Sequence, residues 1–501
     1  MSGPRSPEAR RKTYSVESLD QRVRGSARLC MPSVTPTMGT RIRNIVSHST
    51  PPEAAGSPVT NAASRTSDPS KSPANPYERR PEDVQEPPVG LWKTLRFLGP
   101  GMILVGSVVG SGEIVLTTTL GATVGFVMLW WMLISCWSKS IFQAELARYT
   151  ISSGEPALQA FNRLPGKLPG PHGKVSWFLW LHLLMFVPAH LGGGGIYGGV
   201  GQAVHLALPF LPSTWWTIAF AALASTLILS GTYRFLERMM TFMVVTFTGI
   251  TLACAVCLQF TEYAITLSDF RAGLTFKFPS FAIPIALAAY GGTGVNAGES
   301  MAYTYWCVEK GYARFAGPQN DTPAWARRAR GWIRVMRTDV VLTLCLLTVA
   351  TVPFYMLGAG VLHRTGSRPD GLDTVRVLSQ MYTETLGEWA WWLFVVGAFC
   401  VLFSTVVSGL GAGARVFADA MGVLGMIDPT DYRARKRVLR IWAVVSPAVM
   451  ALCLLLLHPE SRADANDWRD DRGDDDACGC WEHHLLAIPA HASKHRTGVA
   501  N

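Results

Sequence analysis

The sequence predicts an all-α polytopic membrane protein with a transporter architecture built from two inverted repeats. Three observations support this. Charged residues make up only 16% of the 501 residues, and the mean hydropathy is +0.21, whereas a soluble globular protein carries about 25% charged residues. Apolar stretches long enough to cross about 30 Å of hydrocarbon follow one another from Leu91 onward. Two of these stretches are interrupted by glycine at corresponding places. These features argue against a soluble enzyme, and we expect no catalytic residues.

Both ends of the chain differ in composition from its apolar part. Residues 1–90 contain 13 Pro and 13 Ser and neither Trp nor Phe. Such a composition cannot bury enough apolar surface to offset chain entropy. We therefore expect a disordered cytoplasmic segment at 1–90, a transmembrane domain at 91–458 and a disordered acidic tail at 459–501.

Nine membrane-spanning segments are expected in this domain. Each is a run of apolar residues long enough to cross the bilayer, and the connections between them hold most of the charged residues. The nine segments lie near 97–122, 124–147, 175–207, 213–231, 239–260, 280–307, 339–362, 389–414 and 441–458.

The distribution of Lys and Arg predicts the orientation in the membrane. The connections on the same side as the N-terminus carry 23 Lys and Arg, and those on the opposite side carry 5. Because short loops rich in Lys and Arg stay in the cytoplasm, we expect a cytoplasmic N-terminus and a plasma (inner) membrane location. This distribution also accounts for the net charge of +10 without a nucleic-acid partner. The expected partners are the lipid bilayer and a cation, and the sequence predicts no oligomeric state.

The first and sixth spans share a short motif. The first reads Val109-Gly-Ser-Gly-Glu113, and the sixth reads Val295-Asn-Ala-Gly-Glu299. Because the two spans are five apart, the second copy enters the membrane from the opposite side, as in an inverted repeat. The glycines weaken both helices and free backbone amides and carbonyls, which lipid tolerates only where the backbone lines a cavity or is buried in protein. Paired breaks of this kind indicate a binding site near the midplane.

Glu113 and Glu299 are the candidate cation ligands. A charged side chain at the centre of a span costs about 2.5–3.5 kcal/mol on insertion scales, so it is a functional candidate by default. Two facing carboxylates would repel each other unless a cation lay between them. The alternative is a structural ion pair with a basic neighbour, for which Lys139 in the second span is the obvious partner.

Histidine and cysteine carry weaker indications. His182 and His190 in the third span are candidates for a proton relay, since imidazole titrates near neutrality; the alternative is a histidine whose hydrogen bonds are satisfied within the bundle. Seven of the ten cysteines lie inside apolar runs, where they pack as small apolar side chains. We expect no cofactor.

These residues resemble the natural resistance-associated macrophage protein (Nramp) family of divalent-metal transporters. The resemblance runs from Leu98 through the ninth span and rests on three places: Gly99-Pro-Gly101 before the first break, Ala147-Arg148-Tyr149 with Gly154, and residues 403–420. It implies a LeuT-like fold of two inverted five-helix repeats with helices 1 and 6 broken. It also implies a metal bound between these two helices, often with proton coupling.

The sequence departs from the family pattern at the metal site. Where the family has Asp-Pro-Gly-Asn, this chain has Gly110-Ser111-Gly112-Glu113, and where the family has Met-Pro-His, it has Asn296-Ala297-Gly298. Because oxygen donors replace the soft thioether, we expect a hard ion such as Mg²⁺ or Mn²⁺. A carbonyl ligand of the family falls on Thr293. The expected ligand set is Glu113, Glu299, Asn296, Ser111, Gly110 and Thr293.

The sequence therefore predicts a carrier that moves a divalent cation by alternating access, with the metal ion as substrate rather than cofactor. The core of the implied fold needs ten helices, and no tenth apolar segment follows Leu457. One hypothesis is a gene truncated or frame-shifted near position 458, with residues 459–501 out of frame. A second is a non-transporting relic or membrane scaffold, and a third is an organic-cation or sodium-coupled solute transporter on the same fold.

Overall fold

The computed structural model describes residues 75–457 apart from Ser111, residues 231–232 and residues 368–373. The disordered segments predicted within 1–74 and 458–501 lie outside the described residues. The regular secondary structure of the described residues is helical except for one antiparallel hairpin, in which β1 (Lys167–Gly170) pairs with β2 (Gly173–Ser176). This hairpin lies in a connection that the charge distribution assigns to the cytoplasm.

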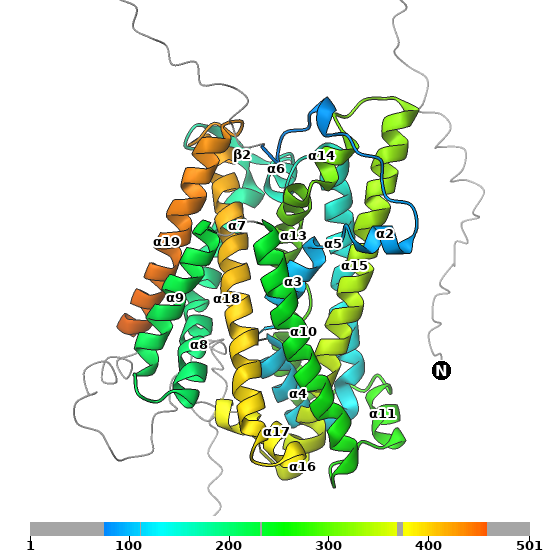
Figure 1. Ribbon diagram of the computed structural model, residues 1–501, viewed down its shortest axis with the longest axis vertical. Helices are drawn as coiled ribbons and strands as arrows, with labels where there is room; N and C mark the ends of the chain where they lie inside the picture. Colours follow the sequence, from blue (N-terminus) through cyan, green and yellow to red (C-terminus); the bar gives the residue numbers. More distant parts are fainter. Residues whose placement is uncertain (1–74, 111, 231–232, 368–373, 458–501) are drawn as a thin grey trace, which may run out of the picture. The chain divides into compact units, whose positions relative to one another are not determined.

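Each predicted span corresponds to helix in the described residues (Figure 1). Six helical stretches there are long and apolar enough to cross a membrane: Gly112–Ser153, Ser213–Ser230, Tyr233–Phe260, Pro323–Thr365, Ala390–Val423 and Tyr432–Leu454. The other predicted spans are interrupted helices. They are α3 (Pro100–Val108), which is followed after its break by η4 (Gly112–Thr117) and α4 (Thr118–Val124) at the start of the first of these stretches, α7 (Trp177–Gly192) with α8 (Gly194–Ala207), and α12 (Ile283–Gly292) with α13 (Ala297–Lys310).

The remaining elements complete the bundle and its connections. The continuous helices are α5 (Leu129–Ser153), α9 (Ser213–Ser230), α10 (Tyr233–Cys257), α15 (Pro323–Leu357), α18 (Ala390–Val423) and α19 (Tyr432–Leu457). The short helices are α2 (Leu91–Leu95), α6 (Ala157–Phe161), α11 (Leu267–Gly273), α14 (Tyr312–Ala316), α16 (His363–Thr365) and α17 (Thr374–Leu386). Single turns or π-helical segments are η3 (Pro81–Asp83), η4 (Gly112–Thr117), η5 (Gly125–Met128), η6 (Leu258–Phe260), η7 (Ser280–Ala282) and η8 (Gly358–Leu362).

Helix α3 lies inside the bundle, in contact with α10, α13, α15 and α18. All of its residues except Met102 are buried. A helix that is apolar all round is stable only when other protein or lipid surrounds it. Because α3 is enclosed by protein, its C-terminal end can leave helical geometry without exposing backbone polar groups to hydrocarbon.

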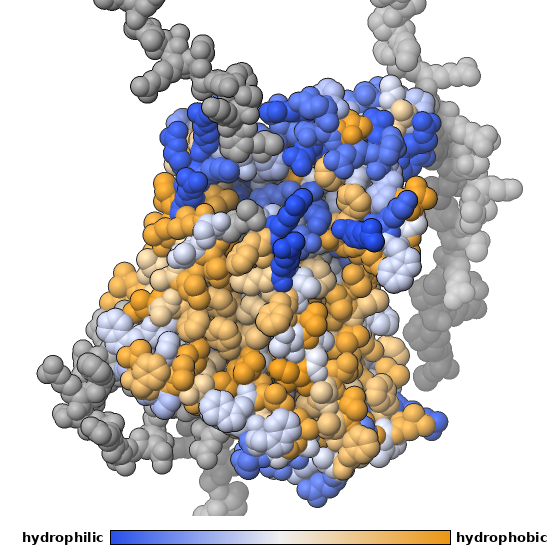
Figure 2. Space-filling view, in the orientation of Figure 1, coloured by the Kyte–Doolittle hydropathy of each residue, from blue (hydrophilic) through white to orange (hydrophobic). Residues whose placement is uncertain are grey.

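The outer surface consists of an apolar band and a strongly hydrophilic end (Figure 2). Large apolar side chains of the described helices are exposed, among them Ile141, Phe242 and Leu287, which are 71%, 70% and 58% accessible. A continuous apolar surface of this kind marks contact with lipid or with another protein. The hydrophilic end, at the top of Figures 1 and 2, includes α6 and α14.

Residues 75–90, which we call the N-terminal strap, lie against this hydrophilic end. Arg79 donates to the Ser152 carbonyl (3.1 Å) and to the Ser153 carbonyl at the C-terminal end of α5. The Gln85 N–H donates to Phe315 O (3.0 Å), and the Trp332 indole donates to Gln85 O (3.0 Å). Composition placed the strap in the disordered segment. The structure orders it through polar contacts with helix ends, which apolar content does not reveal.

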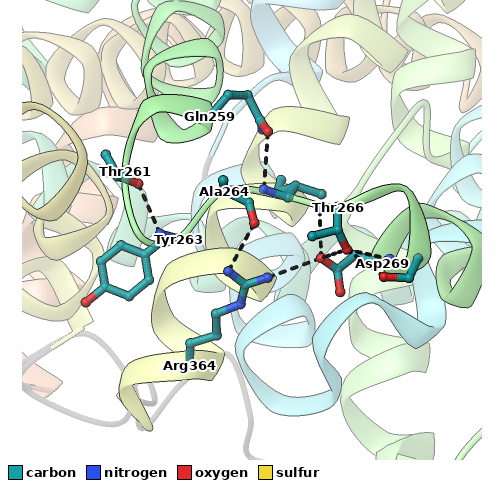
Figure 3. Close-up of polar contacts among 9 residues, drawn as sticks. Gln259, Thr261, Tyr263, Ala264, Thr266, Asp269 and Arg364 are labelled. Atoms are coloured by element: carbon teal, nitrogen blue, oxygen red, sulfur yellow. Dashed lines mark hydrogen bonds and ion pairs between the residues drawn. The ribbon is translucent and has the colours of Figure 1, made fainter.

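At the opposite end, Arg364 fastens the connection between α10 and α12 (Figure 3). Arg364 donates to Ala264 O (3.2 Å) and pairs with Asp269 (3.2 Å). Asp269 also accepts hydrogen bonds from the Thr266 N–H (2.9 Å) and hydroxyl (2.8 Å), which completes a capping box at the start of α11. We call Ala264, Thr266, Asp269 and Arg364 the linker clasp.

Candidate metal centre

The first predicted break is present where α3 ends. Val109 leaves helical geometry with ψ at 81°, and the chain resumes as the π-helical segment η4 before continuing into α4. The Ile114 N–H donates to Gly110 O (3.2 Å), so helical hydrogen bonding restarts directly after the break. Ser111, one of the expected ligands, lies outside the described residues.

The second predicted break separates α12 from α13. Gly294 has φ at +65°, in the left-handed region that favours glycine. Asn296 caps α13, because its Oδ1 accepts a hydrogen bond from the Glu299 N–H (2.9 Å). Both helices that the sequence identified as broken are therefore broken at the predicted glycines.

The two unwound segments touch through their backbones. A Cβ atom on Gly112 would lie 2.0 Å from the Gly292 carbonyl oxygen, and one on Gly110 would lie 2.2 Å from the Thr405 hydroxyl of α18. No side chain fits at either position without displacing its neighbour, so these glycines permit the close approach. The two halves of the inverted repeat meet at this point.

Glu113 joins the two breaks. Its side chain is fully buried, and its Oε2 accepts from the Gly110 N–H (3.3 Å) in the first break. Its Oε1 accepts from the Gly294 N–H (3.2 Å) in the second break. A carboxylate has about four lone-pair sites, so these two amides leave part of its capacity for a further ligand.

Lys139 of α5 binds the same region from the other side. Its ammonium donates to Thr293 O (2.5 Å), to Tyr290 O and to the Ser135 hydroxyl (3.3 Å). Lys139 takes part in none of the ion pairs formed among the described residues. The alternative of a structural ion pair between Lys139 and either glutamate is therefore wrong: the lysine binds backbone carbonyls instead.

Glu299 has one satisfied and one unsatisfied oxygen. Its Oε1 accepts from the Ser107 hydroxyl of α3 (2.7 Å), whereas its buried Oε2 has no hydrogen-bond partner among the described residues. Glu299 lines a cavity of about 190 Å³ together with Asn296 and His182. Because an unsatisfied buried carboxylate oxygen is costly, this oxygen marks a place for a cation or for water.

The other expected residues are distributed around these two glutamates. The Thr293 hydroxyl donates to Ala289 O (2.6 Å), and its carbonyl is already bound to Lys139. Gly110 contributes its N–H to Glu113. His182 reaches the cavity beside Glu299, whereas the side chain of His190 lies outside the described residues. Within the part of the chain that the structure describes, no cluster of three or more His, Cys, Asp or Glu could hold a metal.

Sequence reasoning missed two contributors. Ser107 was hidden in an apolar run, and only its contact with Glu299 reveals it. Asp339 is buried and accepts hydrogen bonds from the Gly99 N–H (3.3 Å), the Gly101 N–H (2.7 Å) and the Tyr303 hydroxyl (2.7 Å). The first amides of a helix such as α3 have no partner within the helix, so they need an acceptor from elsewhere. The single carboxylate at the start of the seventh span was the signal in the sequence for such an acceptor.

Two broken helices from opposite halves of a bundle, which meet at buried carboxylates, define a multi-pass membrane transporter of the LeuT-like inverted-repeat fold. The model of the family described as "Natural resistance-associated macrophage protein-like" matches residues 101–458. This chain belongs to the Nramp family.

Individual relatives are distant in sequence. A crystal structure of the Eremococcus coleocola manganese transporter, in complex with an aromatic bis-isothiourea compound, is 14% identical with a TM-score of 0.54. The match covers 78% of this chain and 79% of that chain. A mutant of the same transporter is 15% identical with a TM-score of 0.55, and the match covers 78% of each chain. An uncharacterized protein of Pasteurella multocida (strain Pm70) is 22% identical over 334 residues, which cover 65% of this chain and 71% of that protein.

Proposed function

We propose that this protein carries a divalent metal cation, Mg²⁺ or Mn²⁺, across the plasma membrane by alternating access. The observation that carries this proposal is Glu299 Oε2, a buried carboxylate oxygen without a partner in the described residues, at a cavity beside the meeting point of the two breaks. A cation there would satisfy this oxygen. Membership of the Nramp family and the fold shared with a manganese transporter support the same substrate class.

The proposed ligands are oxygen atoms. Glu299 supplies the carboxylate and Asn296 an amide oxygen from the same cavity, and Glu113 supplies its remaining lone pairs. Gly110, Ser111 and Thr293 stay in the proposed set as backbone or hydroxyl donors. With so few charged ligands, the ion would keep several waters, as Mg²⁺ does when one or two carboxylates bind it. The absence of a thioether from the set favours a hard ion over late transition metals.

The proposed orientation places the hydrophilic end in the cytoplasm. This end carries the N-terminal strap and includes α6 and α14, and its connections hold most of the Lys and Arg of the chain. Positively charged loops remain on the cytoplasmic side of a membrane. Labelling of a cysteine introduced into the strap, from each side of sealed vesicles, tests the orientation, and labelling from outside would contradict it.

Metal uptake into proteoliposomes tests the ligand assignment. Replacement of Glu299 by Gln removes the charge and keeps the shape, so we expect at least about a tenfold loss of apparent Mn²⁺ or Mg²⁺ affinity, equivalent to about 1.4 kcal/mol. Glu113→Gln should also lower uptake, because the single amide oxygen of Gln cannot accept hydrogen bonds from both the Gly110 N–H and the Gly294 N–H. Glu262→Gln, at an exposed connection, is the matched control and should transport as the wild type does.

Two outcomes would contradict this proposal. Equal uptake by wild type and Glu299→Gln would remove Glu299 from the ligand set. Competition of Mg²⁺ uptake by small organic amines, with saturation at the same site, would instead support the organic-cation alternative.

Proton coupling is proposed to pass through His182, because this histidine reaches the cavity that contains Glu299. His182→Gln should then abolish the stimulation of metal uptake by an inward proton gradient while uptake down a metal gradient continues. Equal stimulation in His182→Gln and wild type would exclude this relay.

A further inference from the structure

The peptide group between Thr293 and Gly294 lies between two opposite charges. Its carbonyl oxygen accepts a hydrogen bond from the Lys139 ammonium (2.5 Å), and its N–H donates to Glu113 Oε1 (3.2 Å). Each peptide unit has a dipole whose N–H end is positive and whose carbonyl end is negative. The carboxylate and the ammonium therefore both stabilise a single orientation of this unwound peptide.

The oxygens around the ammonium have the arrangement of a cation site. The carbonyls of Tyr290 and Thr293 and the Ser135 hydroxyl all accept from Lys139, and the ammonium also lies 4.5 Å from the centre of the Tyr290 ring. Both carbonyls belong to the C-terminal end of α12, where helix carbonyls lack intrahelical partners and the dipole favours positive charge. Carbonyls at the ends of broken helices coordinate monovalent ions in secondary transporters.

The absence of a side chain at Gly294 allows the unwound segment to lie in contact with α5. A Cβ on Gly294 would lie 3.1 Å from Ser135 O and 3.2 Å from Cys136 Cα, so the unwound segment lies directly against α5. The oxygens that bind the ammonium therefore come from two elements packed against each other, α5 and the end of α12. Neither element has to move for the lysine to reach them.

We infer that these oxygens form a monovalent-cation site, which Lys139 fills with its own ammonium group. The tethered ammonium balances the charge of Glu113 through the intervening peptide, so that the wild type needs no Na⁺ or K⁺ from solution at this position. This site shares Thr293 and Glu113 with the proposed metal ligands but lies outside the cavity beside Glu299, and the inference does not depend on which ion is transported. Removal of the ammonium with Glu113 retained would open the site to a small monovalent cation.

The test is the thermal stability of Lys139→Met in detergent. Met keeps the unbranched chain and removes the charge. We expect this variant to melt below the wild type in choline chloride, and to recover by about 3 °C or more when Na⁺, K⁺ or NH₄⁺ replaces choline at equal ionic strength. The recovery should saturate with cation concentration, as expected for binding to the folded state. Wild type and the control Lys277→Met, at an exposed lysine, should not distinguish the small cations from choline.

A double substitution keeps the inference testable if Lys139→Met folds poorly. Glu113→Gln with Lys139→Met removes both charges, so the double variant should be more stable in choline than Lys139→Met alone and should not respond to small cations. The two losses are then coupled rather than additive. The inference is overturned if Lys139→Met melts at the same temperature in choline and in all three small cations. It is also overturned if the fall in melting temperature of the double variant equals the sum of the falls in Lys139→Met and Glu113→Gln. Because these readouts involve no transport, they can fail or succeed independently of the proposed metal carriage.

Discussion

Gly112 and Gly292 bring the two unwound segments into backbone contact, and this contact places Glu113 within reach of amides from both. The Gly110 N–H and the Gly294 N–H bind opposite oxygens of the same carboxylate. A side chain at residue 112 would separate the two breaks. At the scale of single residues, the geometry of the centre therefore depends on glycine as much as on the carboxylates.

Gly112→Ala should lower both stability and metal uptake. Its Cβ would lie 2.0 Å from the Gly292 carbonyl oxygen, and overpacking of this kind costs about 1–3 kcal/mol. The matched control is Gly291→Ala, on the facing helix, where a Cβ meets nothing within 4 Å. Melting temperature in detergent and uptake in proteoliposomes measure both effects. Equal behaviour of the two variants would mean that the backbone contact does not constrain the site.

The sequence was sufficient to place Glu113 and Glu299 beside the two breaks, because each carboxylate follows the glycines of its break within an apolar span, where a charge is costly. It could not show that Lys139 binds the carbonyls of Tyr290 and Thr293, because backbone acceptors look the same at every position of a sequence. The alternative of a direct Lys–Glu ion pair failed for this reason. One peptide group stands between the two side chains.

At the scale of elements, two helices have a carboxylate bound to backbone amides at their N-terminal end. In one helix the carboxylate comes from a distant part of the chain, and in the other it comes from the helix itself. The N-terminal end of α3 is bound by Asp339 of α15, and at the start of α11 the Asp269 carboxylate accepts from the backbone N–H of the N-cap residue, Thr266. Free amides in the first turn of a helix attract negative charge. The spans themselves were predictable from hydropathy, whereas these carboxylate contacts were not, since they depend on tertiary arrangement.

Asp339→Asn should loosen the start of α3. The Gly99 N–H binds Oδ1 of Asp339, whereas the Gly101 N–H and the Tyr303 hydroxyl both bind Oδ2. Asn keeps one acceptor oxygen, so it cannot serve both sets of donors. We expect a loss of about 1–3 kcal/mol, the cost of unsatisfied buried groups, and faster hydrogen exchange in residues 98–104. Tyr303→Phe removes only one of the three hydrogen bonds and should have a smaller effect. A Tyr303→Phe variant at least as perturbed as Asp339→Asn would contradict this account.

The linker clasp should weaken in acid. Partial burial alone would raise the pKa of Asp269, but hydrogen bonds from Thr266 and the charge of Arg364 lower its pKa overall. A group whose pKa is lower in the folded state contributes its full stability above its unfolded value, about 3.9 for Asp. This contribution is lost as the pH falls through the lowered pKa.

A spin label at Leu267, an exposed position in α11, measures this weakening. The label should keep a constant mobility from pH 7 to 5 and become more mobile below about pH 4. In Asp269→Asn the label should already be mobile at pH 7 and should not respond to acid. A label in the wild type that loosens between pH 7 and 5 would assign the transition to another group.

At the scale of the whole molecule, the N-terminal strap connects the two repeats. It contacts the C-terminal end of α5, in the first repeat, through Arg79. It also contacts α14 and α15, in the second repeat, through Gln85. Under the proposed alternating access, one repeat would move against the other, and a segment that bridges both would restrain this motion. The membrane-spanning helices were predictable from the apolar runs, and the inverted repeat from the paired glycine motifs. The strap has no apolar pattern and was visible only in its contacts.

Arg79→Ala should release the strap from α5. The substitution removes two hydrogen bonds from a charged donor to the Ser152 and Ser153 carbonyls, and each such bond contributes about 1.5–3 kcal/mol. Hydrogen exchange in residues 75–90 should therefore accelerate by at least about tenfold, the equivalent of 1.4 kcal/mol, with a smaller increase in the last turn of α5. The adjacent Arg80 is the matched control, because its ion pairs are with Glu78 and Glu82 of the strap itself, and Arg80→Ala should leave exchange unchanged. If the two variants exchange alike, Arg79 does not hold the strap to α5, and the Gln85 contacts, which reach only α14 and α15 of the second repeat, leave the two repeats uncoupled by the strap.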